Sequence, residues 1–164
     1  MGRRKFSKRA RAHDSRSAAP PAALLLDTPP PEEKIIKQRP VVLYAEDNHL
    51  LLPFVCDVLD LLGCHVEWYR DGIRALAALR SAGERHSHYD LILLDNELSS
   101  MSGLEVARHA RQMAQWRQTP IILFALEDCT AVALEVGINE CLRKPNNLLT
   151  LVDAVRRVLP AAKS

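Results

Sequence analysis

The chain has 164 residues, of which 48% are hydrophobic, and a formal net charge of +2. This size predicts one folded domain, and no apolar run reaches the roughly 20 residues that a membrane-spanning helix needs, so a transmembrane anchor is excluded. The charge is uneven: residues 1–39 carry 10 basic and 4 acidic side chains, whereas residues 40–164 carry 12 and 16. We therefore expect a mildly acidic domain behind a basic arm.

Residues 1–39 combine high charge with several prolines, which predicts a disordered arm. Arg3 and Arg4 resemble the start of a twin-arginine export signal, but charged residues up to Arg16 interrupt the apolar segment that such a signal requires. We therefore expect a cytoplasmic protein. A basic arm can contact nucleic acid, although a purely solubilising role is the favoured interpretation.

Cys56, Cys64, Cys129 and Cys141 lack the C-x-x-C spacing of redox and zinc motifs, and three of them stand in apolar segments. A small hydrophobic residue would serve equally well there. We predict four reduced thiols.

From Pro40 onward, short apolar runs alternate with helical periods. This alternation predicts the α/β class, with a parallel sheet, right-handed crossovers and helices on both faces. Strands are expected at 41–45, 65–69, 91–94, 121–126 and 141–142. Helices are expected from about 51 to 62, 72 to 83, 102 to 112 and 148 to 159, with a further short helix after Asp128 that ends at about 136. Five strands and five helices result, without an internal repeat.

Three of the predicted helices carry specific expectations. Pro53 should delay or distort the start of the first helix, and Ser102 with Glu105 has the spacing of a capping box at the start of the third. The buried stripes of the first two helices are predicted from apolar residues at helical spacing. They are Leu51, Phe54, Val55, Val58 and Leu62 in the first, and Ile73, Leu76 and Ala77 in the second.

Charged side chains follow three of the predicted strands. Glu46 and Asp47 follow the first, Asp95 the third and Lys144 the fifth. Because the carboxyl ends of parallel strands meet at one edge of a sheet, these residues should converge. Closely placed carboxylates repel one another unless a hard divalent cation neutralises them, and Mg²⁺ meets that demand.

This inventory is suited to phosphoryl transfer. With two acids holding the metal, the third can attack a phosphoryl group whose charge is shared by the metal and a lysine. Asp95 is the best nucleophile candidate, because the run that leads to it, Leu91 to Leu94, is the most apolar in the chain. The alternative is a set of unrelated charges at the ends of strands.

The chain from about 41 to 159 resembles the receiver domain of bacterial two-component response regulators. The resemblance rests on YAEDN at 44–48, LILLDNELSSMSG at 91–103 and LRKP at 142–145. It implies a flavodoxin-like, receiver-type domain at 40–160, between the arm at 1–39 and a tail at 161–164. It also implies that a histidine kinase or phosphotransfer protein delivers the phosphoryl group to Asp95.

The resemblance also implies a role for each site residue. Asp47 and Asp95 would hold Mg²⁺ directly, Glu46 would act through water, and the backbone carbonyl of Glu97 would complete the protein ligands. Lys144 would pair with the acceptor or the phosphate. The bond before Pro145 would be cis.

Four positions depart from the family pattern. Ala125 stands where the family has a threonine or serine that binds the incoming phosphate, and Cys141 stands where an aromatic switch residue is common. Leu126 replaces a small residue and could crowd the phosphoryl site, and Ser99 replaces a proline. The acceptor, metal ligands and lysine are therefore present, whereas the usual conformational readout is missing.

We predict a response regulator without an effector domain that signals through contact with an unidentified downstream protein. It would not be an enzyme, apart from self-catalysed phosphotransfer and dephosphorylation. One alternative is a phosphorylation-independent adaptor or dimerisation module, with a homodimer as the assembly. The other is a phosphatase of the haloacid dehalogenase type, since Asp95, Asn96 and Glu97 loosely resemble its nucleophile motif. That motif normally lies on an early strand, and little chain remains here for a substrate cap.

Overall fold

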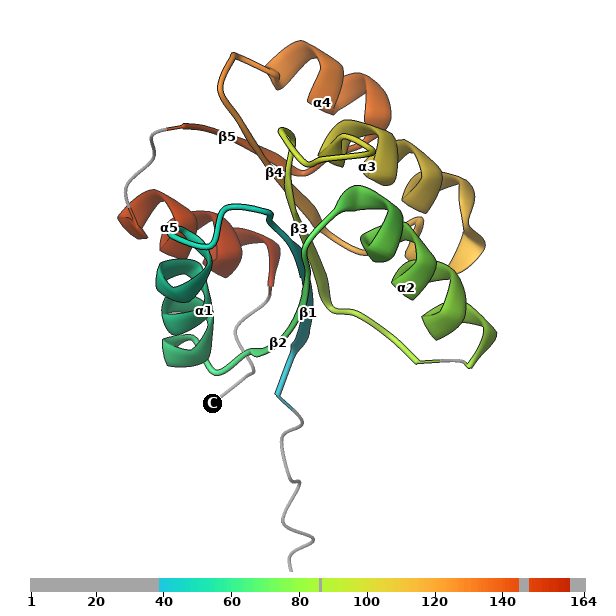
Figure 1. Cartoon of the computed structure of the whole chain (residues 1–164), viewed down its shortest axis with the longest axis horizontal. Helices are drawn as coiled ribbons and strands as arrows, with labels where there is room; N and C mark the ends of the chain where they lie inside the picture. The colour runs from blue at the N-terminus through green and yellow to red at the C-terminus, as the bar shows by residue number, and fades with distance from the viewer. Residues whose placement is uncertain (1–38, 86, 145–147, 160–164) are drawn as a thin grey trace, which may run out of the picture. The chain divides into compact units, whose positions relative to one another are not determined.

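A single parallel sheet of five strands, in the order β2-β1-β3-β4-β5, forms the centre of the protein (Figure 1). The computed structural model describes residues 39–85, 87–144 and 148–159. The strands are β1 (Val41–Ala45), β2 (His65–Tyr69), β3 (Leu91–Asp95), β4 (Ile121–Ala125) and β5 (Glu140–Arg143). The helices are α1 (Leu52–Leu61), α2 (Gly72–Glu84), α3 (Gly103–Gln112), α4 (Thr130–Val136) and α5 (Leu148–Val158), with a short 3₁₀ turn, η1 (Ala114–Trp116). The predicted fold class is confirmed.

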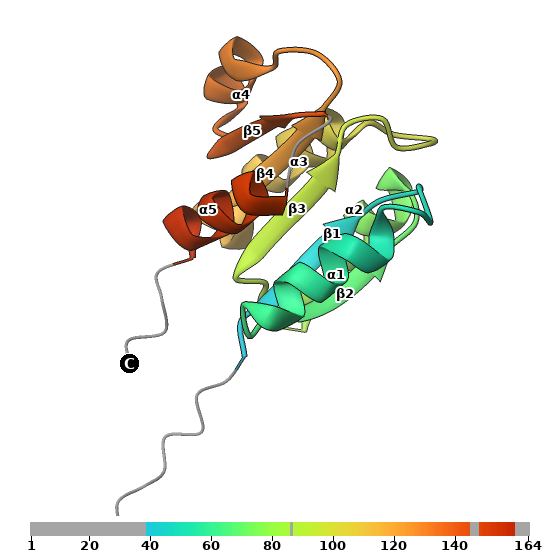
Figure 2. The ribbon, with the colours of Figure 1, turned by 90° about the vertical axis from the view of Figure 1, so that its left-hand side faces the viewer.

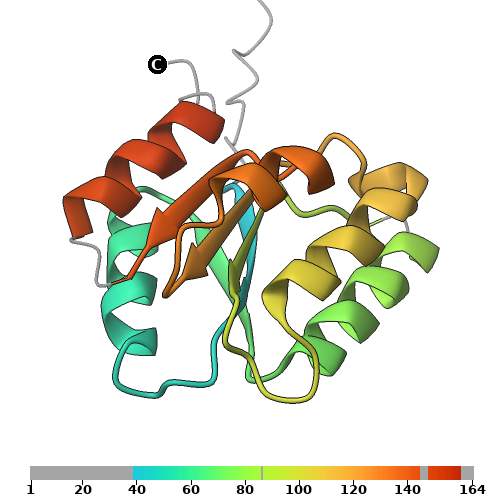
Figure 3. The same cartoon turned by 90° about the horizontal axis from the view of Figure 1, so that it is seen from above.

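The apolar runs form strands because both faces of the sheet are covered. Every residue of β3 and β4 is buried, as expected for central parallel strands. Alternate residues of each strand point to opposite faces: Val42 and Tyr44 pack with α1 and α5, whereas Leu43 and Ala45 pack with α2 and α3. Figure 3 shows α1 and α5 on one side of the sheet and α2 and α3 on the other.

The helix boundaries follow the predicted local signals. Pro53 lies at the second position of α1, which begins at Leu52, and there its missing N–H removes no intrahelical hydrogen bond. Ser102 and Glu105 form the expected capping box at the start of α3, because the Ser102 hydroxyl accepts from the Glu105 N–H and the Glu105 carboxylate accepts from the Ser102 N–H. Gly137 ends α4 with a φ of 82°, a conformation in which a side chain would be strained.

The buried stripes of α1 and α2 differ from the predicted ones. Four assignments were wrong, because Leu51, Phe54, Ile73 and Ala77 are all exposed, Phe54 at 59% and Ile73 at 55%. The buried residues include Val55, Val58 and Leu59 in α1, and Ala75, Leu76, Leu79 and Ala82 in α2. Adjacent apolar residues permit two overlapping stripes at helical spacing, and only contact with the sheet selects one.

The predicted reduced state of all four cysteines was also wrong. Cys129 and Cys141 form a disulfide with Cα atoms 6.1 Å apart, which joins the start of α4 to β5, while Cys56 and Cys64 are unpaired. The separation of 12 residues between Cys129 and Cys141 matches no cysteine motif. The return of the chain through α4 to β5 brings the two side chains together.

The described residues belong to one compact unit. Arg39, which the sequence placed in the arm, donates hydrogen bonds to the side chain of Asp60 and to the carbonyl of Gly63. The predictions for the rest of the arm, for the tail at 161–164 and for the bond before Pro145 lie outside the described residues. Within the described part, no helix has the length and apolar character needed to cross a membrane.

Candidate functional site

Three carboxylates gather where β1 and β3 end. Glu46 and Asp47 follow β1, and Asp95 is the last residue of β3. The register pairs Ala45 with Leu94, which places the two strand ends level with each other. Figure 2 shows the arrowheads of the strands pointing to this edge. Each carboxylate offers an oxygen within 4.8 Å of the other two, and we call these acids with Lys144 the acidic edge.

Glu46 is buried at 1% exposure and tightly held. The Tyr44 hydroxyl donates to one carboxylate oxygen at 3.1 Å, and the Asn48 N–H donates to the other at 2.9 Å. Burial raises the pKa of Glu46, and the nearby charge of Asp95 adds to the rise, which exceeds the opposing effects of the hydrogen bonds and of Lys144. A cation at this edge would offset that cost.

Asp95 is 2% exposed, and both of its hydrogen bonds among the described residues fall on Oδ1. The Lys144 Nζ donates to Oδ1 at 2.6 Å and the Glu97 N–H donates at 3.1 Å. Burial lowers the pKa of Lys144, but Asp95, Glu46 and Glu97 outweigh it and the net pKa is raised. Lys144 is therefore a firmly charged partner of the acceptor carboxylate.

The backbone around Asp95 fixes its position. A Cβ on Gly103 would lie only 2.3 Å from the Asp95 carbonyl oxygen, so the start of α3 can approach the end of β3 only with glycine there. The side-chain oxygen of Asn96 accepts from the Leu104 N–H at 3.2 Å, which secures the intervening loop. The Ser99 N–H donates to Asp47 at 3.2 Å and ties the same loop to the other acid.

The donor set fits a hard divalent cation. It consists of carboxylate oxygens, which Mg²⁺ prefers, and two of the three acids are buried where repulsion between them is costly. Lys144 supplies one positive charge against these three acids. The sequence-based prediction that Glu46, Asp47, Asp95 and Lys144 converge therefore agrees with the geometry, whereas their individual roles remain predictions.

The end of β4 offers no hydroxyl to the site. Ala125 is 3% exposed, and the following Leu126 is 58% exposed. The Leu126 N–H donates to Oε1 of Glu97 at 3.2 Å, and Oε2 of Glu97 lies 3.3 Å from the Lys144 Nζ. The sequence analysis considered only the backbone carbonyl of Glu97 and missed this bridging side chain. Its signal was an acid two residues after the acceptor.

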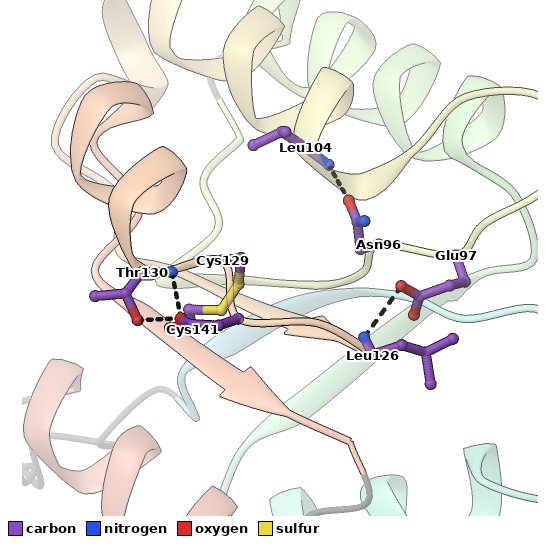
Figure 4. Close-up of a disulfide and its surroundings, with 8 residues drawn as sticks. Asn96, Glu97, Leu104, Leu126, Cys129, Thr130 and Cys141 are labelled. Carbon is purple, nitrogen blue, oxygen red and sulfur yellow. Dashed lines mark hydrogen bonds between the residues drawn. A yellow bond between two sulfur atoms is a disulfide. The ribbon is translucent and has the colours of Figure 1, made fainter.

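Cys141, which stands where the family often has an aromatic switch residue, is bonded to Cys129 in a disulfide (Figure 4). Next to this disulfide is a cavity of about 280 Å³, whose lining includes Glu97, Ala125, Leu126 and Cys129. The disulfide pairing of Cys129 was the second feature that the sequence analysis missed.

Comparisons with known proteins support one family. The family model described as the response regulator receiver domain matches residues 42–156. The chain is 36% identical over 118 residues to the response regulator protein PmrA of Pseudomonas aeruginosa, a match that covers 70% of this chain and 50% of that protein. It is 36% identical over 115 residues to the autoinducer 2 sensor kinase/phosphatase LuxQ of Vibrio vulnificus, covering 63% of this chain and 12% of that protein. The chain thus spans half or less of these relatives.

Solved structures give the same result. The chemotaxis protein CheY4 of Vibrio cholerae is 30% identical, with a TM-score of 0.64, and the match covers 74% of this chain and 99% of that one. The receiver domain of the sensor histidine kinase PA1611 of Pseudomonas aeruginosa is 29% identical, with a TM-score of 0.62, and the match covers 74% and 98%. That structure has a magnesium ion coordinated in its active-site cleft.

Proposed function

Because the chain belongs to the response regulator receiver family, we propose that it accepts a phosphoryl group on Asp95 from a histidine kinase or a phosphotransfer protein. The observation that carries the proposal is the state of Asp95 itself. This carboxylate is buried and is held through Oδ1 by Lys144 and by the Glu97 N–H, beside two further acids. The second oxygen, Oδ2, accepts no hydrogen bond from any described residue and is the nucleophile that we propose.

The proposed transfer is a single displacement at phosphorus. Oδ2 of Asp95 forms a bond to phosphorus while the bond from phosphorus to the donor's imidazole nitrogen breaks, and the electrons of that bond leave with the imidazole. Lys144, within 2.6 Å of Oδ1, provides a fixed positive charge where the transferred oxygens carry negative charge. Glu46, Asp47 and Asp95, with the backbone carbonyl of Glu97, would hold Mg²⁺, which would share that charge when bound.

Incubation with acetyl phosphate and Mg²⁺ tests the proposal. Intact-mass measurement should show the addition of one phosphoryl group to the wild-type chain and none to Asp95→Asn, which keeps the size of the side chain but is a far poorer nucleophile. Omission of Mg²⁺ should strongly reduce the yield. A wild-type chain that gains no phosphoryl group would contradict the proposal, and equal labelling of Asp95→Asn would place the acceptor elsewhere.

A second candidate function is a phosphorylation-independent adaptor or dimerisation module. It is favoured by Ala125, which offers no hydroxyl, and by the disulfide that fastens Cys141 to Cys129. In this case Asp95→Asn would retain binding to the downstream partner or to a second copy. The phosphatase alternative gains no support, since the matching family model is that of receiver domains.

The cellular compartment of the protein is also part of the proposal. We propose that the protein works in the cytoplasm, where histidine kinases of two-component systems deliver their phosphoryl groups. The disulfide between Cys129 and Cys141 is unusual for that compartment, in which thiols are mostly kept reduced. Its redox state in cells is therefore worth measuring by alkylation of free thiols before lysis.

A further inference from the structure

The carboxylate of Glu97 lies between two hydrogen-bond donors beside Asp95. Its Oε1 accepts from the Leu126 N–H at 3.2 Å, and its Oε2 lies 3.3 Å from the Lys144 Nζ. The same ammonium contacts Oδ1 of Asp95 at 2.6 Å. Figure 4 shows the Glu97 side chain reaching from the loop after β3 to the backbone of Leu126 at the end of β4. The Glu97 carboxylate thus joins Lys144 to the loop after β4.

A phosphoryl group on Asp95 would occupy the space around Lys144 that the Glu97 carboxylate now borders. It would be bonded to a carboxylate that Lys144 already contacts, so its oxygens would enter the space around that ammonium. Two anions there repel each other and compete for the same N–H donors. Glu97 has room to leave, because its side chain is 33% exposed and borders the cavity of about 280 Å³.

We propose that Glu97 is a built-in competitor of the phosphoryl group, which must displace its carboxylate from Lys144 and from the Leu126 N–H. This inference rests on the proposed function. Displacement would release the hydrogen bond between Glu97 and Leu126, which links the loop after β3 to the loop after β4. Ala125 stands where the family pattern has a threonine or serine. In its absence, loss of this hydrogen bond would transmit phosphorylation of Asp95 to the chain between β4 and β5.

A purely structural role for Glu97 makes a different prediction. If its carboxylate only braced the two loops, its removal would loosen the site and weaken the binding of a phosphoryl mimic. If it competes with the phosphoryl group, its removal strengthens that binding. The direction of the change therefore separates the two roles.

The test uses beryllofluoride, a phosphoryl mimic, with Mg²⁺ and the full chain. Titrations are followed by backbone NMR for the wild type, Glu97→Gln, Glu97→Ala and Glu127→Gln. Glu127 lines the same cavity and has no hydrogen bond or ion pair to another described residue, so its variant removes an equal charge without the bridging contacts. Glu97→Gln keeps the side-chain size and guards against a folding defect in Glu97→Ala.

We expect both Glu97 variants to bind beryllofluoride about three- to tenfold more tightly than the wild type, and Glu127→Gln to stay within about twofold, because only Glu97 occupies the donors. Without the mimic, Glu97→Ala should already shift the Leu126 amide resonance. Unchanged or weaker binding by both Glu97 variants, or an equal gain in Glu127→Gln, would overturn the inference. A wild type that binds no beryllofluoride and gains no phosphoryl group from acetyl phosphate would instead overturn the proposed function, and this inference with it.

Discussion

The acidic edge and the segment from β4 to β5 (residues 125–141) lie next to each other but differ in how they follow the receiver pattern. At the acidic edge, Asp95 and Lys144 are in contact and Glu46 and Asp47 lie close by, as the family resemblance implied. The β4–β5 segment instead has an alanine at its start and a disulfide between Cys129 and Cys141. The difference separates the residues that we propose accept a phosphoryl group from the positions at which the family pattern places the conformational readout.

Removal of the disulfide should give the largest change, and it should be confined to stability. A double Cys129→Ala, Cys141→Ala variant frees a loop of 12 residues, for which chain entropy predicts a loss of about 3 kcal/mol in the free energy of unfolding. Urea denaturation without reductant measures this loss. Dithiothreitol should bring the wild type to the same value, and Cys56→Ala, which alters an unpaired cysteine, is the control. A large fall in the rate of phosphorylation by acetyl phosphate would break the separation of the two regions.

The next effect concerns metal binding at the acidic edge. Asp47→Ala should weaken Mg²⁺ binding at least about tenfold, because a hard cation loses one of its few carboxylate ligands. Fluorescence can report it, since the Trp68 indole donates to the Glu46 carbonyl at 2.8 Å. Asp57→Ala, which removes an exposed acid on α1, should leave the affinity unchanged. Phosphorylation of Asp47→Ala at the wild-type rate would contradict the assigned site.

A smaller effect should follow from restoring a hydroxyl at the end of β4. Ala125→Thr should enlarge the NMR shifts that beryllofluoride causes in residues 127–143, because a new hydrogen bond to the charged mimic could move the conformational equilibrium by about tenfold. The adjacent cavity gives the hydroxyl space, and a further Leu126→Ala change removes any crowding by that side chain. Large shifts in the unaltered protein would show that Ala125 and Cys141 do not prevent the switch.

The smallest expected effect concerns the start of α4. Both the hydroxyl and the N–H of Thr130 donate to Asp128 and lower its pKa. Because the folded-state pKa lies below the unfolded value of about 3.9, the stabilising contribution is present above that pH and is lost as the pH falls through the folded-state pKa. An NMR titration should find the Asp128 carboxyl titrating below about pH 3.9, and Thr130→Ala should raise its pKa. A normal pKa in the wild type would show that these bonds are absent in solution.

The sequence predicted the features that depend on neighbouring residues or on the parallel topology of the sheet. The strands were predictable because apolar runs such as Leu91 to Leu94 are too short for a separate helix and end at polar residues. The capping box of Ser102 and Glu105 was predictable because its partners are only three residues apart. The convergence of Asp95 and Lys144 was also predictable, since parallel strands bring their carboxyl ends to one edge.

The remaining features depended on contacts between distant segments. Phe54 and Val55 are both compatible with a buried stripe, and packing of α1 against the sheet left Phe54 exposed. The pairing of Cys129 with Cys141 required the turn of the chain through α4, which no cysteine spacing encodes.

The sequence by itself determined the fold class and which residues meet at the acidic edge, because the strands are recognisable from local pattern and parallel topology brings their last residues together. The order of the strands in the sheet came from the structure. The tertiary structure alone decided what the Glu97 side chain contacts. Its carboxylate meets the Leu126 N–H and Lys144, which are 29 and 47 residues away along the chain. A side chain of that length can reach several partners, and only the packed positions of β3, β4 and β5 select among them.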